Sequence, residues 1–503
     1  MKIAFCTLGC KLNFAESSAI GKALLGQGHV RAKQGEAADV VVLNTCSVTD
    51  AADHKGRQAI HRLRRQHPQA VLIVTGCYAE LKGQEIKAMP EVDYVLGANE
   101  KERVVEIVRT LDEGLRIKDE RQNSVLDEGL RIKDERRNSV LDEGLRIKDK
   151  RLNSINSDTS ETKVISPSSC VLHPSSKHET FFPACSWDDR TRCFLKVQDG
   201  CNYFCTYCTI PLARGRSRNA SIADIVAQAE QALRDGAREI VLTGVNIGDF
   251  GRSTGERFID LLRALDELGT LPIPPYKGGS RENSSDSETS ETKVISPSSC
   301  VLHPSSYPYR LRISSCEPNL LTDEVIDFVA NSKHFAPHFH IPLQSGSNEV
   351  LKIMHRHYDR ELFAERVAHI RERMPNAFIG VDCMVGVRGE TEERWEDYLA
   401  FVKQLDVSQL HVFTYSERAN TRMLEMDLYV VPKKERERRS KILHAVSAEK
   451  LQAFYAKHQG EEATVLWEGK KDNGMMAGFT ENYIKVHAPY DKTKVNTFEV
   501  VRI

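Results

Sequence analysis

Short apolar runs rich in β-branched residues alternate with longer amphipathic stretches near the start of the chain. The predicted strands cover Lys2–Leu8, Asp39–Thr45 and Ala70–Thr75, and the predicted helices cover Glu16–His29 and Asp50–Arg65. Strands that are apolar throughout, rather than at every second position, are typical of a parallel sheet covered by helices on both faces. We therefore predict an N-terminal domain over residues 1–110 with an open parallel α/β sheet.

The same alternation returns between residues 191 and 430. The predicted strands there cover Cys193–Val197, Glu239–Leu242, Tyr309–Ile313, His338–Ile341, Ala377–Val381 and Gln409–Phe413, with amphipathic helical stretches between them. Such repeated strand–helix units predict an α/β fold in the form of a partial (βα)6 barrel.

The last segment, residues 431–503, has a different pattern. Pro432–Lys457 is charged along its length and predicts one helix, whereas Glu462–Ile503 alternates apolar and polar residues and contains Gly469, Gly474 and Gly478. Alternation with a period of two, interrupted by glycines, predicts a small antiparallel β-barrel.

Two duplications interrupt this organisation. Leu111–Val125 recurs at Leu126–Val140 and again from Leu141, and Glu161–Ser176 is repeated at Glu291–Ser306. Near-identity of the first copies is typical of recent duplication rather than of a folded array, and the second copies are Ser/Pro-rich. We interpret residues 111–190 and about 272–306 as insertions and linkers, largely disordered, in which Cys170 and Cys300 are not ligands.

Thirteen cysteines change the picture, because the chain shows no export signal at its N-terminus. We expect metal ligation or catalysis, rather than a disulfide framework, to account for most of them. No apolar run is long enough to span a membrane, so we expect a cytoplasmic protein. The net charge of −1 predicts that any RNA contact depends on local basic patches.

The sharpest chemical signal is the C-x3-C-x2-C spacing of Cys201, Cys205 and Cys208, directly after a predicted strand. Three thiolates at this spacing can hold three irons of a 4Fe–4S cluster and leave the fourth iron open. A zinc site would need a fourth ligand nearby, which is missing, and a redox CxxC pair would not explain Cys201. This loop resembles that of the radical S-adenosylmethionine superfamily.

A second set of cysteines comes from the N-terminal domain. Cys10, Cys46 and Cys77 each follow one of the predicted strands. Because the carboxyl ends of parallel strands share one edge of an open sheet, we expect the three thiols to meet and to hold a second 4Fe–4S cluster. Three separate buried cysteines are the alternative, while Cys6, inside the first strand, is interpreted as a core residue.

With two open clusters, the chain resembles the methylthiotransferase family of radical S-adenosylmethionine enzymes. The resemblance covers essentially the whole chain except the duplicated segments. It rests on the strings TLGCKLN, LNTCSVT, TGCYAE, CNYFCTYCTIPLARGRSR, EIVLTGVNIGDFG, RISSCEP, HFHIPLQSGSNEVLKIMHR and GETEERW. The string GFTENYIKV resembles part of the family's RNA-binding β-barrel, the TRAM domain.

The resemblance implies that S-adenosylmethionine binds the cluster of the C-x3-C-x2-C loop and yields a radical that abstracts hydrogen from the substrate. The second cluster would hold the sulfur that is methylated and delivered. Within the family, the chain is most similar to enzymes that convert N6-threonylcarbamoyladenosine beside the tRNA anticodon to its 2-methylthio derivative. N6-isopentenyladenosine, a ribosomal-protein aspartate and a non-catalytic RNA-binding relic are the alternatives.

Further candidate residues follow from the resemblance and from their places after predicted barrel strands. Those expected to bind the cofactor are Tyr207, Gly244, Asn246, Ser314, Glu317, Gln344 and Gly386, and those expected to bind RNA are Arg214, Arg216, Arg218, Tyr483 and Lys485. Core packing of Tyr207, simple turns after the strands and a solvated arginine loop are the alternatives.

One string departs from the family. The family usually has Gly-Phe-Pro-Gly-Glu after the fifth barrel strand, and this chain has Gly386-Val387-Arg388-Gly389-Glu390. The arginine is expected to loosen the backbone and to add a charge at the barrel mouth. The resemblance further implies a tRNA anticodon stem-loop as partner, a flavodoxin- or ferredoxin-like electron donor, no membrane contact and a monomeric protein.

Overall fold

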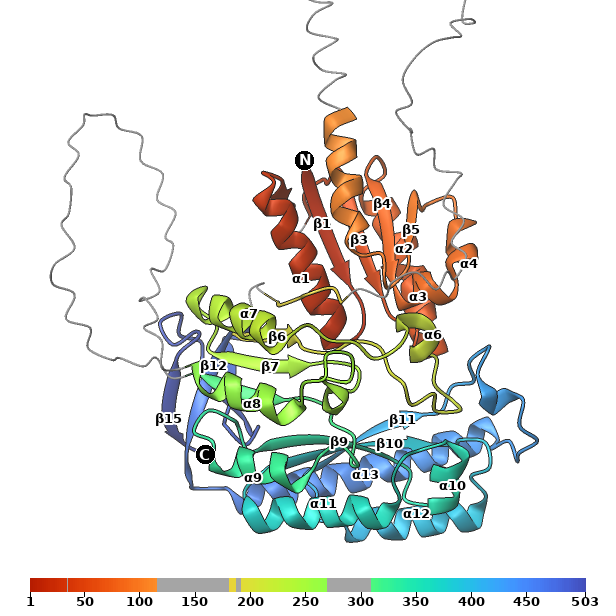
Figure 1. Ribbon diagram of the computed structural model, residues 1–503, viewed down its shortest axis with the longest axis vertical. Coiled ribbons are helices and arrows are strands. Elements are labelled where there is room, and N and C mark those ends of the chain that lie inside the picture. The colour runs from red at the N-terminus through yellow and green to blue at the C-terminus, as the bar shows by residue number, and fades with distance from the viewer. Residues whose placement is uncertain (34, 115–180, 187–190, 269–308) are drawn as a thin grey trace, which may run out of the picture.

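The computed structural model describes residues 1–33, 35–114, 181–186, 191–268 and 309–503 (Figure 1). The duplicated copies, with Cys170 and Cys300, lie almost entirely outside these residues, and their predicted disorder stays a prediction. None of the helices in the described part of the chain combines the length and the apolar composition that crossing a bilayer requires.

The N-terminal domain is the predicted open parallel sheet, with strand order β2-β1-β3-β4-β5. Its elements are β1 (Lys2–Thr7), α1 (Lys11–Gly26), β2 (Val30–Arg31), β3 (Val40–Thr45), α2 (Asp50–Gln66), β4 (Val71–Gly76), α3 (Cys77–Leu81), α4 (Gly83–Lys87) and β5 (Tyr94–Leu96), followed by a helix over 103–114. All six residues of β3 are buried, because helices cover both faces of the sheet.

Helix α1 begins at Lys11, earlier than the predicted start at Glu16. Its first turns bury the polar residues Asn13 and Glu16 beside Leu12 and Ala15. Buried polar positions interrupt the apolar periodicity from which a helix is predicted. The helix was therefore predicted to begin too late in the sequence.

The central domain is a parallel α/β unit of two three-stranded sheets, β6-β7-β8 and β11-β10-β9, joined by bridges such as Ser315–His340. Its strands are β6 (Arg192–Lys196), β7 (Glu239–Thr243), β8 (Arg310–Ile313), β9 (His338–Gln344), β10 (Phe378–Val385) and β11 (Gln409–Thr414). Its helices are α6 (Ile210–Arg214), α7 (Ile222–Arg234), η3 (Ile247–Asp249), α8 (Phe258–Asp266), α9 (Asp323–Asn331), α10 (Asn348–Ile353), α11 (Arg360–Arg373), α12 (Glu392–Gln404) and η5 (Arg422–Leu424). This confirms the predicted (βα)6 arrangement, although β9 and β10 extend beyond their predicted ends.

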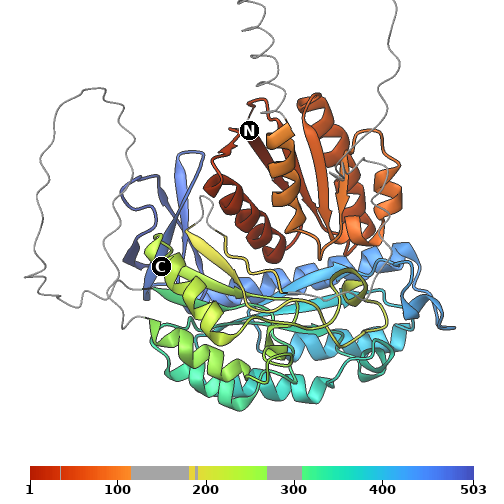
Figure 2. The same cartoon turned by 45° about the horizontal axis from the view of Figure 1, so that its top comes forward.

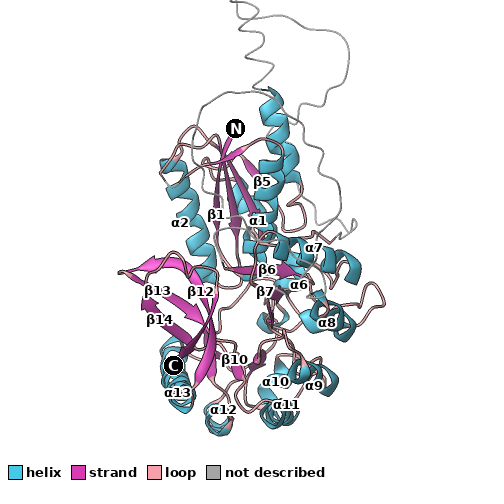
Figure 3. Ribbon diagram, turned by 90° about the vertical axis from the view of Figure 1, so that its left-hand side faces the viewer, coloured by secondary structure: helices cyan, strands magenta, loops and turns pink. Residues whose placement is uncertain are grey.

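The C-terminal segment consists of α13 (Lys433–Lys457) and a four-stranded antiparallel sheet. The sheet order is β14-β13-β12-β15, from β12 (Glu462–Asp472), β13 (Met475–Phe479), β14 (Lys485–Pro489) and β15 (Phe498–Arg502). Figure 3 shows this curled sheet beside α13 and the central strands. The guanidinium of Arg310 donates to the carbonyl oxygens of Phe479 and Thr464 and so ties β8 to the sheet.

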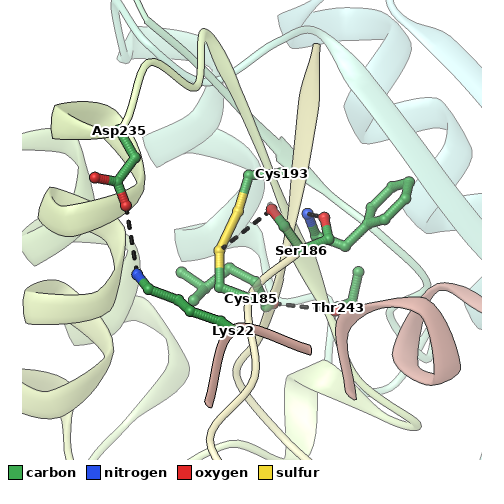
Figure 4. The surroundings of a disulfide bond; sticks show 8 residues. Lys22, Cys185, Ser186, Cys193, Asp235 and Thr243 are labelled. Atoms are coloured by element: carbon green, nitrogen blue, oxygen red, sulfur yellow. Dashed lines mark hydrogen bonds and ion pairs between the residues drawn. A yellow bond between two sulfur atoms is a disulfide. The ribbon is translucent and has the colours of Figure 1, made fainter. Parts of the chain in front are cut away.

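The carboxyl ends of β1, β3 and β4 point toward the central domain (Figures 1 and 2). A surface ion pair from Lys22 of α1 to Asp235 after α7, at 3.4 Å, contributes to this contact (Figure 4). Beside it, Cys185 and Cys193 form a disulfide. Metal ligation or catalysis, which is expected for most of the cysteines, therefore does not account for these two.

Candidate active site

The structure brings Cys10, Cys46 and Cys77 together at the predicted edge of the N-terminal sheet. Cys10 caps α1 after β1, Cys46 follows β3, and Cys77 opens α3 after β4. The turn at Gly9, with φ +115°, passes so close that an added Cβ would lie 2.6 Å from the Cβ of Cys46. Glycine is required there, because both the positive φ and the close approach exclude a side chain.

Burial raises the pKa of the Cys46 thiol to about 11, and the neighbouring Cys77 and Cys10 thiols add to the shift. Burial also raises the pKa of Cys77, while the cations of Arg214 and Lys101 oppose the rise. Without a ligand, the Cys46 and Cys77 thiols would be protonated at neutral pH, and coordination to iron would remove the proton.

The second set lies on the loop between β6 and α6. The backbone N–H groups of Tyr203 and Ile210 approach the sulfurs of Cys201 at 3.5 Å and Cys208 at 3.4 Å. Burial raises the pKa of Cys201 to about 11 and of Cys208 to about 12, and the thiols of this set further raise one another's pKa. Hydrogen bonds to sulfur of this kind stabilise thiolates that ligate a cluster.

Among the described residues, no three His, Cys, Asp or Glu side chains converge as ligands of a single metal ion. That result fits the two cysteine sets, because each thiolate of a cubane cluster binds a different iron and the sulfurs remain apart. Both sets supply the three thiols that such a cluster requires, and each set includes one buried cysteine, Cys77 or Cys205.

Arg356 fixes the geometry beside the cysteine loop. Its Nη1 lies 3.2 Å from the sulfur of Cys205 and 3.4 Å from the hydroxyl of Tyr207, and its Nη2 pairs with Glu317. Tyr207 packs into an apolar cluster with Met354, Met423 and others. That position agrees with the core-packing interpretation of Tyr207, and Glu317 is committed to the guanidinium of Arg356.

Other predicted cofactor residues surround the same barrel mouth. Asn246 is 2% exposed, and neither its amide oxygen nor its amide nitrogen has a hydrogen-bond partner. The Oε1 atom of Gln344 is also unpartnered. Buried polar atoms without partners are rare in proteins, so these side chains fit a site for a polar ligand such as the amino acid portion of S-adenosylmethionine. Gly244 and Ser314 lie at the ends of the neighbouring strands β7 and β8.

The departure at Val387-Arg388 is accommodated by local pairing. Arg388 donates to Glu417 at 3.0 Å, and Val387 is fully buried. The turn has positive φ at Gly386 and Gly389, and the carboxylate of Glu390 accepts from the Gly386 N–H at 2.9 Å. The charge added by Arg388 is therefore neutralised.

A buried ion cluster joins the two cysteine sets, and no pattern in the sequence predicted it. Its members are Glu16, Lys101, Lys196, Asp199, Arg214 and Arg218. Burial opposes the ionisation of Glu16, but the cations of Arg214, Lys101 and Lys196 outweigh it and lower the pKa of Glu16. The cations outnumber the carboxylates in this cluster, which places excess positive charge next to Cys77.

Arg214 and Arg218 therefore do not lie where they were predicted to contact RNA. Their guanidiniums are buried and bond to Glu16, Asp199, Asn13 and Asn99. The string RGRSR is typical of an exposed basic loop. The burial of Arg214 and Arg218 depends on partners far away in the sequence, which the string itself does not indicate. Arg216 and Lys485, by contrast, are exposed.

A cavity of about 570 Å³ opens between the three parts of the chain. It is lined by Cys10 and Lys11 of the N-terminal domain, by residues of the central strands such as Arg312 and Asp382, and by Tyr483 of the C-terminal segment. The Tyr483 hydroxyl accepts from Arg192 at 3.2 Å, and its ring stacks against Phe479. The predicted RNA residue Tyr483 thus belongs to the cavity wall.

Two protein families match this chain, one over the N-terminal domain and one over the central domain. Residues 2–97 match the family described as "Uncharacterized protein family UPF0004", and residues 195–402 match the "Radical SAM superfamily". The chain is 33% identical over 489 residues to the threonylcarbamoyladenosine tRNA methylthiotransferase MtaB of Bacillus subtilis (strain 168), covering 96% of this chain and 89% of the relative.

Two further comparisons are more distant. The chain is 26% identical over 510 residues to the tRNA-2-methylthio-N(6)-dimethylallyladenosine synthase of Clostridium botulinum (strain Langeland / NCTC 10281 / Type F), covering 99% and 93% of the two chains. The structure of the radical S-adenosylmethionine methyltransferase TsrM from Kitasatospora setae matches with a TM-score of 0.49 and 13% identity, over 82% of this chain and 72% of that one.

Proposed function

This chain belongs to the methylthiotransferase family of radical S-adenosylmethionine enzymes, and from that premise we propose that it methylthiolates N6-threonylcarbamoyladenosine in tRNA. The observation that carries the proposal is the buried ion cluster, in which Arg214 connects the segments that carry the two cysteine sets, one on each domain. The 33% identity to a threonylcarbamoyladenosine enzyme, against 26% to a dimethylallyladenosine enzyme, favours the first substrate.

The proposed site holds two 4Fe–4S clusters. Cys201, Cys205 and Cys208 would hold the cluster that binds S-adenosylmethionine, and the N-terminal cysteines would hold the other. When bound, S-adenosylmethionine would supply the radical and the methyl group, and the N-terminal cluster would supply the transferred sulfur. The chain's own residues supply placement: Asn246 and Gln344 offer unpartnered polar atoms for the cofactor.

The buried ion cluster has a defined part in this proposal. It locks α1, which follows Cys10, against α6, which follows the cysteine loop, through the Arg214–Glu16 and Arg214–Asn13 contacts. Its cations Arg214 and Lys101 oppose the rise that burial causes in the pKa of Cys77. The two clusters would then keep a fixed separation on either side of the substrate.

RNA would reach the cavity along the exposed basic residues. We assign the TRAM-like, RNA-binding role to residues 431–503, with Lys485 contacting phosphates and Tyr483 at the cavity wall. Arg216, which lies 5.7 Å from the exposed ring of Phe204, is the candidate contact beside the cysteine loop. Phosphate contacts of this kind position an RNA without reading its sequence.

The remaining parts of the proposal concern the cellular setting. A cluster of this type needs single electrons, for which we propose a flavodoxin- or ferredoxin-like donor. We propose a cytoplasmic, monomeric enzyme whose partner is the anticodon stem-loop of tRNA.

Nucleoside mass spectrometry of tRNA from cells with and without the gene tests the substrate. We expect loss of 2-methylthio-N6-threonylcarbamoyladenosine and accumulation of its precursor, both restored by the wild-type gene and not by a Cys205→Ala variant. Loss of the 2-methylthio isopentenyl nucleoside would transfer the assignment to that substrate. An unchanged set of tRNA nucleosides would contradict tRNA methylthiolation.

A further inference from the structure

Lys11 differs from the other cations that line the central cavity. It is the first residue of α1, directly after Cys10, and its side chain is exposed to the cavity. In the part of the chain that the structure describes, its ammonium has no ion pair and no hydrogen bond. A cation that faces a cavity without a partner is a candidate for binding an anionic group of a ligand.

The other two cations of the wall are committed to protein groups. Arg312 pairs with Glu239 at 2.9 Å and donates to the carbonyl oxygen of Glu481 at 3.1 Å. Arg192 pairs with Glu468 at 2.7 Å and donates to the hydroxyl of Tyr483. Both arginines therefore hold the C-terminal sheet against the barrel.

The carboxylate in the cavity wall is also paired with a protein group. Asp382 is the one carboxylate among the residues that line the cavity, all of them within the described ranges, and it pairs with Nε2 of His340 at 2.9 Å. Nδ1 of His340 is in turn bonded to the Ser315 hydroxyl at 2.6 Å. No ion pair is thus formed between Lys11 and this wall, whose Asp382 attracts the ammonium less than Arg192 and Arg312 repel it.

A second, independent observation points to a polar ligand in the same cavity. His338 lines the wall, is 7% exposed, and its Nδ1 has no hydrogen-bond partner in the structure as described. A buried ring nitrogen without a partner costs free energy unless a ligand or water supplies one. The cavity therefore offers a free ammonium and an unpartnered ring nitrogen together.

The proposed substrate carries a matching group. The N6-threonylcarbamoyl substituent ends in a carboxylate and a hydroxyl, whereas a dimethylallyl substituent is an uncharged hydrocarbon. N6 and C2 of adenine both flank N1, so a substituent folded toward N1 lies on the edge where the methylthio group is added. That edge must face the N-terminal cysteines, and Lys11 directly follows one of them.

We infer that Lys11 binds the carboxylate of the threonylcarbamoyl group and thereby selects this nucleoside over one with an uncharged N6 substituent. The inference rests on the proposed function and assigns a specificity determinant within it. Lys11 transfers no atom in the reaction. It contributes a charge-assisted hydrogen bond that exists only with the acidic substrate.

The test compares three anticodon stem-loop RNAs that differ only at one adenosine. One carries N6-threonylcarbamoyladenosine, the second carries its carboxyl methylamide, and the third carries unmodified adenosine. Fluorescence anisotropy measures their binding to the reconstituted full-length protein without oxygen. The ratio of affinities for the acid and the amide isolates the carboxylate contact, because any general loss of folding or cluster content affects both RNAs equally.

We expect the wild-type protein to prefer the acid over the amide about tenfold or more, as for a hydrogen bond between charged groups. Lys11→Met should reduce this ratio to near one, and Lys11→Arg should retain it. Lys22→Met is the matched control, since it makes the same change further along the same helix at the ion pair with Asp235. That control should keep the wild-type ratio.

Two results would overturn different parts of the argument. If Lys11→Met keeps the wild-type ratio, Lys11 does not bind the carboxylate, while the proposed function stands. If the wild-type protein neither prefers the acid nor methylthiolates it, the assignment of the substrate itself is wrong. Equal weakening of the acid and the amide in Lys11→Met is one form of the first result, because it leaves the ratio unchanged, and it is the signature of a counter-charge to the neighbouring cluster.

Discussion

The guanidinium of Arg214 lies 3.0 Å from the carboxylate of Glu16, and both side chains are almost completely buried. Glu16 belongs to the helix that Cys10 caps, and Arg214 ends the short helix that follows the C-x3-C-x2-C loop. This contact therefore connects the two cysteine sets through one ion pair. The same guanidinium also pairs with Asp199 at 3.0 Å, on the connection between β6 and the cysteine loop.

Arg214→Ala should destabilise the folded chain by about 3–5 kcal/mol, because it leaves buried carboxylates with fewer partners. Urea unfolding followed by fluorescence measures the change, and limited proteolysis should show earlier cleavage between the domains. Arg216→Ala, at an exposed position of the same loop, serves as the control. Equal unfolding midpoints for the two variants would contradict a stabilising role for the pair.

Iron content should separate the two cysteine sets. We expect about eight irons per reconstituted wild-type chain and about four in Cys10→Ala or in Cys205→Ala, because each change removes one ligand of one cubane cluster. Cys6→Ala, a change inside β1, is the control and should retain the wild-type content. A wild-type value near four irons would leave a single cluster and rule out the two-cluster proposal.

Stability should fall as pH rises between about 4.5 and 7, in part because of Glu390. Burial raises the pKa of its carboxyl to about 7, although Arg439 and the Gly386 N–H oppose the rise. The folded protein then holds a proton in this range that the unfolded chain has released, and the contribution reaches on the order of 3 kcal/mol above pH 7.

The comparison of wild type with Glu390→Gln isolates this effect from all other titrations. The glutamine still accepts the Gly386 N–H and has no charge to lose. Chemical unfolding at a series of pH values should therefore show the variant gaining stability relative to wild type between about pH 4.5 and 7. A constant difference across the series would show that Glu390 titrates normally.

Lys485→Ala should weaken tRNA binding several-fold and reduce its salt dependence. Removing one phosphate contact lowers the slope of log K against log salt by about 0.7 to 0.9. Filter binding at several salt concentrations measures both quantities. Lys55→Ala, an exposed position on α2, is the control, and an identical effect of the two changes would exclude a specific contact at Lys485.

Much of this architecture was predictable from the sequence. The β-branched runs of β3 and β4 are buried on both faces, so their pattern identifies them without any tertiary information. Because parallel strands end at one edge, the convergence of Cys10, Cys46 and Cys77 followed from topology alone. The antiparallel pattern of the C-terminal segment was equally visible, from its alternation.

The charged interior was not predictable in the same way. A buried Arg214 and an exposed Arg216 lie in one basic string, and only their distances from Glu16 and Asp199 distinguish them. The cavity position of Lys11 is likewise a property of three segments far apart in the chain. The one signal available beforehand was its place directly after a predicted ligand at the open edge of the sheet.

The buried ion cluster also imposes an order on biosynthesis. Glu16 leaves the ribosome well before its partners Lys196 and Arg214, and the long segment over residues 115–180 is made in between. In a nascent N-terminal domain Glu16 can therefore pair only with Lys101 until the first barrel strand and the cysteine loop emerge. Stable closure around the N-terminal cysteines then becomes a late event, which favours delivery of iron and sulfide to a chain whose synthesis is already well advanced.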